Sequence, residues 1–99
     1  MQYQIIFRAR AKREYVQSVG WYRERSIQAA ENFVAQIEAV VSAIQEQPDF
    51  YRKTYKQYRE ARAKKYPYSI VYFVDEENNT VVITSVFHQK RNPADKFSK

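Results

Sequence analysis

The sequence contains no cysteine, a single glycine and only three prolines in 99 residues. The absence of cysteine excludes disulfide bonds, thiolate nucleophiles and cysteine-ligated zinc. The scarcity of glycine and proline favours long helices and strands with short connections over a loop-rich or disordered chain. The chain also lacks an apolar run near the roughly 20 residues that span a bilayer, and its N-terminus lacks the apolar segment of a signal peptide. We therefore expect a small cytoplasmic protein that does not enter a membrane.

Basic and aromatic residues are plentiful by contrast, with nine tyrosines, six phenylalanines and a formal net charge of +6. Residues 52–65 hold one acid, Glu60, and seven basic residues, so this segment alone carries a charge equal to that of the whole chain. The seven are Arg52, Lys53, Lys56, Arg59, Arg62, Lys64 and Lys65. A positive field from one segment attracts polyanions, either nucleic acid or an acidic protein segment. The alternative is a solvated strand edge, because Lys and Arg also protect exposed edges.

The first half of the chain predicts one strand followed by two helices. Residues 2–8 alternate between apolar and polar side chains, which is typical of a strand. Helical spacing begins at Ala9, and we expect Gly20 and the charged run at residues 23–25 to weaken the end of this first helix. Ser26 is the predicted N-cap of a second helix, which Pro48 ends. Its apolar stripe consists of Ala30, Phe33, Val34, Ile37, Val40, Val41 and Ile44.

The second half predicts a connection and three strands. Residues 49–55 read as a basic, aromatic connection, and residues 57–63 alternate weakly, as a strand would. Residues 67–74 and 80–87 are rich in β-branched and aromatic residues, which favours strands, with a hairpin loop at residues 75–79. A polar C-terminal tail begins at Asn92.

The predicted order is therefore β-α-α-β-β-β, a single α+β domain over residues 1–99. We expect a helical hairpin packed on one face of a mainly antiparallel four-stranded sheet. The other face is expected to stay open and to carry the basic residues. Trp21, near the predicted turn between the helices, either covers that turn or serves as an exposed anchor for a partner.

Three short motifs in the second half resemble a known family. They are the helix end at residues 44–48 (IQEQP), the strand at residues 66–72 (YPYSIVY) and the strand end at residues 86–93 (VFHQKRNP), with Arg59 between the first two. Together with the element order, they resemble the RelE/ParE superfamily of toxins from type II toxin–antitoxin systems, including plasmid stabilisation systems. This resemblance implies a growth inhibitor that a cognate antitoxin with an acidic segment neutralises. RelE-like members are similar to ribosome-dependent mRNA endonucleases, whereas ParE-like members poison DNA gyrase without being enzymes.

The resemblance also suggests candidate site residues. In a metal-independent endoribonuclease, Arg59 would hold the phosphate and His88, the only histidine, would serve as the acid–base group. A structural hydrogen bond at a strand end is the alternative role for His88. Residues expected to bind nucleic acid or another target are Arg52, Lys53, Lys56, Arg62, Lys64, Lys65, Lys90 and Arg91. No cofactor is expected, and no metal site, because His, Asp and Glu form no cluster with ligand spacing.

Two departures from the family pattern favour a ParE-like toxin. Nuclease members typically carry an arginine where this chain has Ser69, and they often carry a C-terminal tyrosine, whereas no tyrosine follows Tyr72 here. The predicted target is therefore DNA gyrase. A RelE-like endonuclease acting on the ribosome and its mRNA is one alternative, and a non-toxic partner-binding module is the other.

Overall fold

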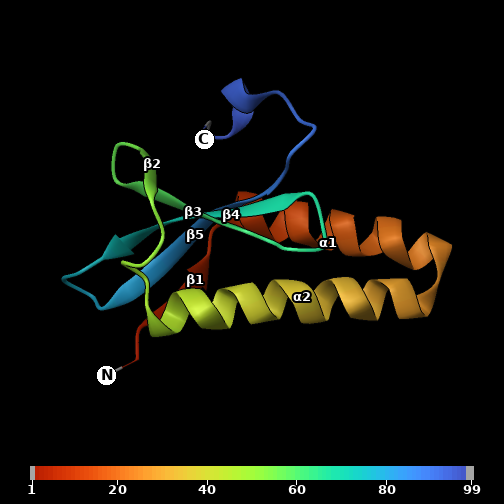
Figure 1. Ribbon diagram of the computed structural model, residues 1–99, viewed down its shortest axis with the longest axis horizontal. Helices are drawn as coiled ribbons and strands as arrows, with labels where there is room; N and C mark the ends of the chain where they lie inside the picture. Colours follow the sequence, from red (N-terminus) through yellow and green to blue (C-terminus); the bar gives the residue numbers. More distant parts are fainter. Residues whose placement is uncertain (1, 98–99) are drawn as a thin grey trace.

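The computed structural model describes residues 2–97 and shows two helices packed against a sheet (Figure 1). In chain order the elements are β1 (Gln4–Phe7), α1 (Ala9–Arg25), α2 (Ile27–Glu46), β2 (Lys53–Tyr55), β3 (Tyr58–Arg62), β4 (Tyr68–Asp75), β5 (Thr80–His88) and a 3-10 turn, η1 (Pro93–Asp95). The predicted α+β class and the helical hairpin that follows the first strand are confirmed.

The sheet has five strands in the order β1-β5-β4-β3-β2, one more than the sequence predicted. β1 runs parallel to β5, and every other neighbouring pair is antiparallel. The additional strand is β2, which falls within the predicted connection and pairs with β3 at the sheet edge. All three of its side chains are exposed, so the segment has no apolar alternation from which a strand could be predicted.

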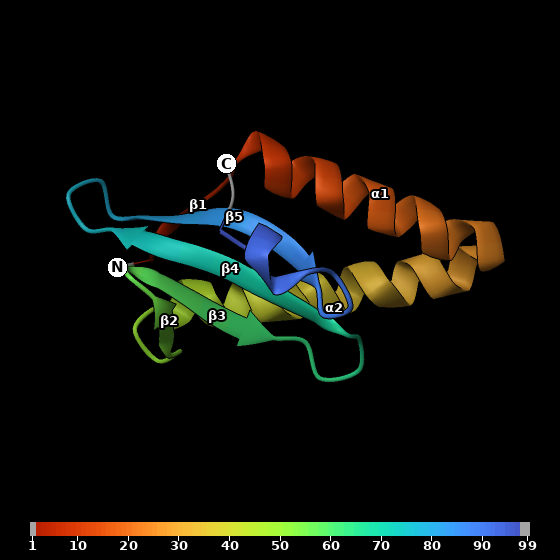
Figure 2. The ribbon, with the colours of Figure 1, turned by 90° about the horizontal axis from the view of Figure 1, so that it is seen from above.

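A single residue, Ser26, separates the two helices of the hairpin. Ser26 ends α1, and its Oγ accepts a hydrogen bond of 2.9 Å from the backbone N–H of Ala29, which confirms it as the N-cap of α2. Gly20 does not interrupt α1, which continues to Arg25 and ends where the charged run at residues 23–25 ends. One glycine costs a helix only about 1 kcal/mol, and the packing of α1 against α2 and β5 outweighs this cost (Figure 2).

The core lies between the helices and the sheet. Phe33, Ile37 and Ile44 of α2 are buried there against Tyr68, Ile70 and Tyr72 of β4. The ring of Phe33 contacts four tyrosine rings, with centroid distances of 4.7–6.2 Å: Tyr15, Tyr22, Tyr66 and Tyr68. The predicted apolar stripe thus forms the core face of α2, except that Ala30 and Val34 line a groove on the outer side of the hairpin.

The opposite sheet face is not open, contrary to the sequence-based expectation. The chain after β5 folds back over this face, and η1 lies on the side of the sheet away from α2 (Figure 1). Phe97 stacks on Tyr55 and approaches Tyr58, with centroid distances of 4.6 and 5.3 Å. Lys96 forms an ion pair of 3.1 Å with Glu60. The reason is that this face also carries apolar side chains, including Phe73 and Phe87, which require cover from water.

Within residues 2–97, neither helix combines the length and the apolar character that a membrane crossing requires.

Candidate functional site

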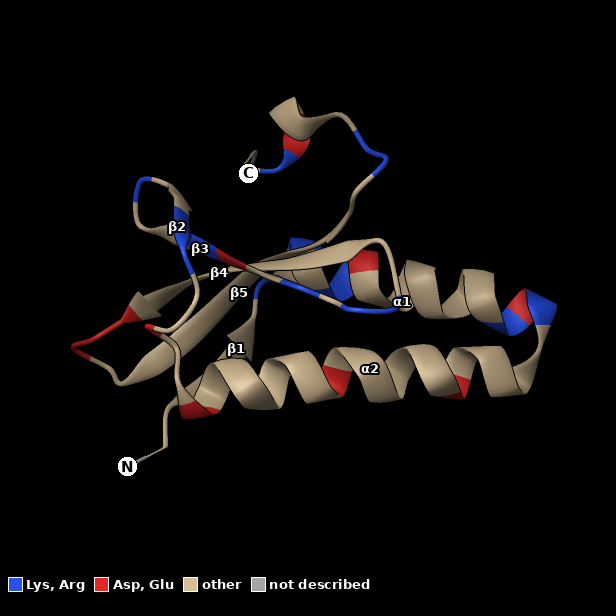
Figure 3. Cartoon of the chain, viewed as in Figure 1, with Lys and Arg blue, Asp and Glu red and all other residues tan. Residues whose placement is uncertain are grey.

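The basic segment is divided between two places on the sheet edge (Figure 3). Arg52, Lys53 and Lys56 are exposed on β2 and at the turn that follows it. Arg62 ends β3, and Lys64 and Lys65 lie in the connection to β4; all three are exposed. The six cations therefore face solvent along one edge, where they are available to a polyanionic partner.

Arg59 differs from these six because its side chain points to the helix side of the sheet. It is paired across the strands with Tyr72, a core residue, and is only 17% exposed. Its guanidinium donates hydrogen bonds to the backbone carbonyls of Asp49 and Tyr51, at 3.2 and 2.6 Å, and lies 3.5 Å from the Asp49 carboxylate. Arg59 therefore fastens the connection between α2 and β2 through its Nη1, while its Nη2 faces the Asp49 carboxylate.

His88 ends β5 and is partly buried against the edge of the Tyr68 ring, with centroids 4.9 Å apart. Its Nδ1 accepts a hydrogen bond of 3.0 Å from the backbone N–H of Lys90. Burial lowers the pKa of His88 from its ordinary value of 6.5, and the charges of Lys90 and Arg91 lower it further. The imidazole is thus neutral at pH 7, with its proton on Nε2.

The two candidate catalytic residues do not share a site. Arg59 lies opposite Tyr72, whereas His88 lies opposite Tyr68. These partners are four residues apart on β4, which is about 13 Å at a rise of roughly 3.3 Å per residue. A phosphate bound at Arg59 would therefore be out of reach of the His88 imidazole, because proton transfer needs hydrogen-bond distance.

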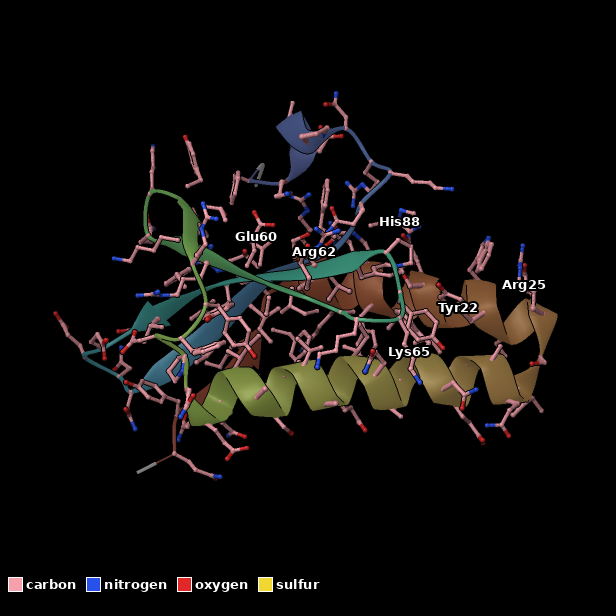
Figure 4. All side chains as sticks on the ribbon, in the orientation of Figure 1. Tyr22, Arg25, Glu60, Arg62, Lys65 and His88 are labelled. Atoms are coloured by element: carbon pink, nitrogen blue, oxygen red, sulfur yellow. The ribbon has the colours of Figure 1, made fainter. Side chains whose placement is uncertain are left out.

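A cleft of about 580 Å³ lies beside His88, between α1 and the adjoining ends of β4 and β5. Figure 4 shows Tyr22 and His88 at this end of the molecule. The lining side chains include Gln17, Trp21, Tyr22, Tyr68, His88 and Lys90. The cleft thus combines an aromatic wall with a neutral imidazole and a cation.

Glu14 forms the centre of a polar network at one side of this cleft, and the sequence analysis missed it. Its carboxylate accepts hydrogen bonds from the Ser85 hydroxyl and the Val86 backbone N–H, at 2.8 and 3.0 Å, and forms ion pairs with Arg10 and Arg91. Burial raises the pKa of Glu14, but the bonds from Ser85, Arg91 and Val86 outweigh it and hold the pKa below its ordinary value. Only the Arg10 pair, four residues away on the same helix, is visible in sequence.

The outer side of the helical hairpin carries a second feature, an apolar groove. Its residues are Tyr15, Val16, Val19, Gly20, Arg23, Ile27, Ala30, Glu31, Val34, Ala35 and Glu38, and the part nearest Ile27 has a volume of about 370 Å³. Val16 and Ile27 are 69% and 67% exposed. A contiguous apolar surface of this kind on a small protein indicates a binding surface for a partner. We call it the hairpin groove.

Across residues 2–97, no group of three or more His, Asp or Glu side chains is arranged to hold a metal ion.

The arrangement of two helices packed on a mixed sheet matches the fold of the RelE toxins. The isolated RelE toxin of E. coli is 20% identical to this chain, with a TM-score of 0.64 over 93% of this chain and 89% of that one. The intact RelBE toxin–antitoxin complex of E. coli contains a chain that is 21% identical, with a TM-score of 0.62 over 90% of this chain and 99% of that one. At this level of identity the likeness concerns the fold.

The sequence itself places the chain within a particular family. The profile of the ParE toxin of type II toxin–antitoxin systems, parDE, matches residues 5–93. The protein therefore belongs to the ParE toxin family. None of the curated proteins compared with the chain matches it.

Proposed function

We propose that this ParE-family toxin arrests growth by binding DNA gyrase, without catalysing a reaction itself. The observation that carries the proposal is the separation of Arg59 from His88, each already engaged in internal hydrogen bonds. Ser69 adds support, because the position where nuclease members carry an arginine is here a buried serine whose hydroxyl accepts a bond from Gln89. The exposed cations at the sheet edge are available to bind an acidic surface of gyrase. The proposed place of action is the cytoplasm.

The purified toxin is expected to block supercoiling of relaxed plasmid by gyrase and to leave mRNA on translating ribosomes intact. Induction in cells without antitoxin should likewise trigger DNA-damage signalling before protein synthesis falls. Normal supercoiling at a large molar excess of toxin would contradict the proposal. Absence of any growth arrest would instead favour the non-toxic partner-binding module.

A ribosome-dependent endonuclease is the second candidate, and one pocket favours it. A hollow of about 340 Å³ on the tail side of the sheet is lined by Arg8, Arg10 and Lys96, together with Tyr58 and Phe97. Three cations and two aromatic rings suit an RNA backbone and its bases. If mRNA cleavage is observed, Arg59→Lys and His88→Ala would test the catalytic roles, since a nuclease that depends on these residues loses cleavage in both variants.

We further propose that the cognate antitoxin covers the hairpin groove with an amphipathic segment. The apolar residues of the hairpin groove would bind the apolar side of such a segment. An acidic extension of the segment would then lie over the basic sheet edge. Inhibition would then combine burial of apolar surface with charge neutralisation.

Ile27→Asp is expected to weaken antitoxin binding at least tenfold, because it places a carboxylate in the apolar groove. The fold should tolerate the change, since Ile27 is the first residue of α2 and an acid is favourable in a first helical turn. Titration calorimetry with the purified antitoxin measures the effect. Gln28→Asp is the matched control, because the neighbouring side chain is exposed and does not line the groove. Equal affinity of the two variants would exclude the hairpin groove as the antitoxin site.

A further inference from the structure

The cleft beside His88 has the composition of a ligand site, although neither inhibition of gyrase nor binding of an antitoxin in the hairpin groove requires it. Its volume of about 580 Å³ falls within the range of small-molecule sites. Side chains far apart in sequence form it: Gln17 and Trp21 come from α1, Tyr68 from β4, and His88 and Lys90 from the end of β5 and the residues after it.

Trp21 supplies the surface on which a flat ring can stack. It is the only tryptophan of the chain, and its side chain is 51% exposed. Contacts with its neighbours hold the indole in place: the Arg25 guanidinium covers one face, 3.3 Å from the ring centroid, and the Tyr22 ring lies nearly perpendicular to the indole at 4.9 Å. Arg25 does not line the cleft, so a ligand in the cleft would stack on the other face. An exposed aromatic ring that is already fixed loses little conformational freedom when a ligand stacks on it.

The polar groups of the cleft are placed to complement such a ring. His88 presents its Nε2–H, because Nδ1 accepts the bond from Lys90, and Gln17 can both donate and accept. Lys90 is exposed and takes part in none of the ion pairs within residues 2–97. Glu14 is compensated by Arg10 and Arg91, so the local charge is positive.

We propose that this cleft binds one nucleotide unit of a single-stranded nucleic acid, with the base stacked on Trp21 and the phosphate next to Lys90. Base–aromatic stacking does not depend on the identity of the base, and one cation matches one phosphate. An acidic peptide is the less suitable occupant, because it would leave the aromatic wall without a flat partner. The inference is independent of the proposed gyrase inhibition, since it concerns direct binding of nucleic acid to the toxin alone.

Fluorescence of the single tryptophan provides the test. Five-nucleotide oligomers of thymidine and of uridine are titrated into the purified protein, with inorganic phosphate and a five-residue glutamate peptide as further probes. We expect saturable quenching by the oligonucleotides and none by phosphate or peptide. Comparison of the two oligonucleotides shows whether DNA or RNA is preferred. Failure of both to quench, or quenching by the peptide alone, would overturn the proposal.

Variants separate stacking from general electrostatic attraction. Anisotropy of a labelled oligonucleotide should show about tenfold weaker binding for Trp21→Ala, within the range that stacking contributes per base. Lys90→Gln should weaken binding several-fold. Lys12→Gln is the matched control, because it removes an equal charge from an exposed position of α1 that does not line the cleft. Equal losses for Lys90→Gln and Lys12→Gln, or none for Trp21→Ala, would show that the cleft is not the site.

Discussion

Phe33→Ala is expected to lower the free energy of unfolding by about 3–5 kcal/mol, the usual cost of removing a buried aromatic side chain. Phe33 is fully buried, and its ring contacts four tyrosine rings that belong to α1, β4 and the connection before β4. Alanine would leave a cavity that these rings, fixed by their own neighbours, fill only in part. Because a small domain has a total stability of about 5–15 kcal/mol, the variant should approach the limit of folding at 37 °C.

Urea unfolding followed by circular dichroism measures this loss. Val16→Ala is the matched control, since Val16 is an apolar residue of α1 that is 69% exposed, and its truncation should change stability by less than about 0.5 kcal/mol. If both variants lost the same amount, Phe33 would not be the centre of the core.

Glu14→Gln is expected to destabilise the fold by about 2–3 kcal/mol, although it preserves the shape of the side chain. The carboxylate joins α1 to β5 through Ser85 and Val86, and to the tail through Arg91. A neutral amide would weaken the ion pairs with Arg10 and Arg91 and would deprive these two partly buried cations of the negative charge of Glu14. The loss of stability is therefore expected to exceed the contribution of the hydrogen bonds alone.

The effect of Glu14 should depend on pH in a defined direction. Its pKa is lowered in the folded state, so its contribution is complete above the ordinary pKa of 4.5 and disappears as the pH falls through the folded-state value. The difference in stability between wild type and Glu14→Gln should therefore be complete at pH 6 and should decrease as the pH is lowered from 4.5 toward 2. A difference that stays constant between these pH values would show that the carboxylate charge is not what stabilises the network.

Local signals in the sequence sufficed for every helix and strand except β2, but not for the site. The cap at Ser26 and the stripe from Phe33 to Ile44, apart from Val34, follow from short-range spacing, and both are confirmed. β2 was missed because its exposed side chains carry no alternation. The position of the tail could not be predicted, because it depends on Phe97 meeting Tyr55 and Tyr58, residues far apart along the chain.

The same limitation applies to the functional residues. The weak alternation of residues 57–63 gave no indication that backbone carbonyls of the preceding connection bind the guanidinium of Arg59. Nor could spacing show that α1 brings Trp21 to the cleft beside His88. Whether a charged residue serves structure or binding depends on contacts across the sheet, which no local pattern contains.

The parallel pairing of β1 with β5 has a consequence for how the toxin is made. Gln4 is paired with Thr80, so the first strand acquires its only neighbour in the sheet when the last strand has been synthesised. Contacts between such distant segments slow folding and delay it until late in translation. The nascent chain therefore has no complete sheet and no finished core while it is being made. The sheet of this ParE-family protein can therefore be completed only after β5 has been synthesised, and the antitoxin that we propose for the hairpin groove would meet the two helices first.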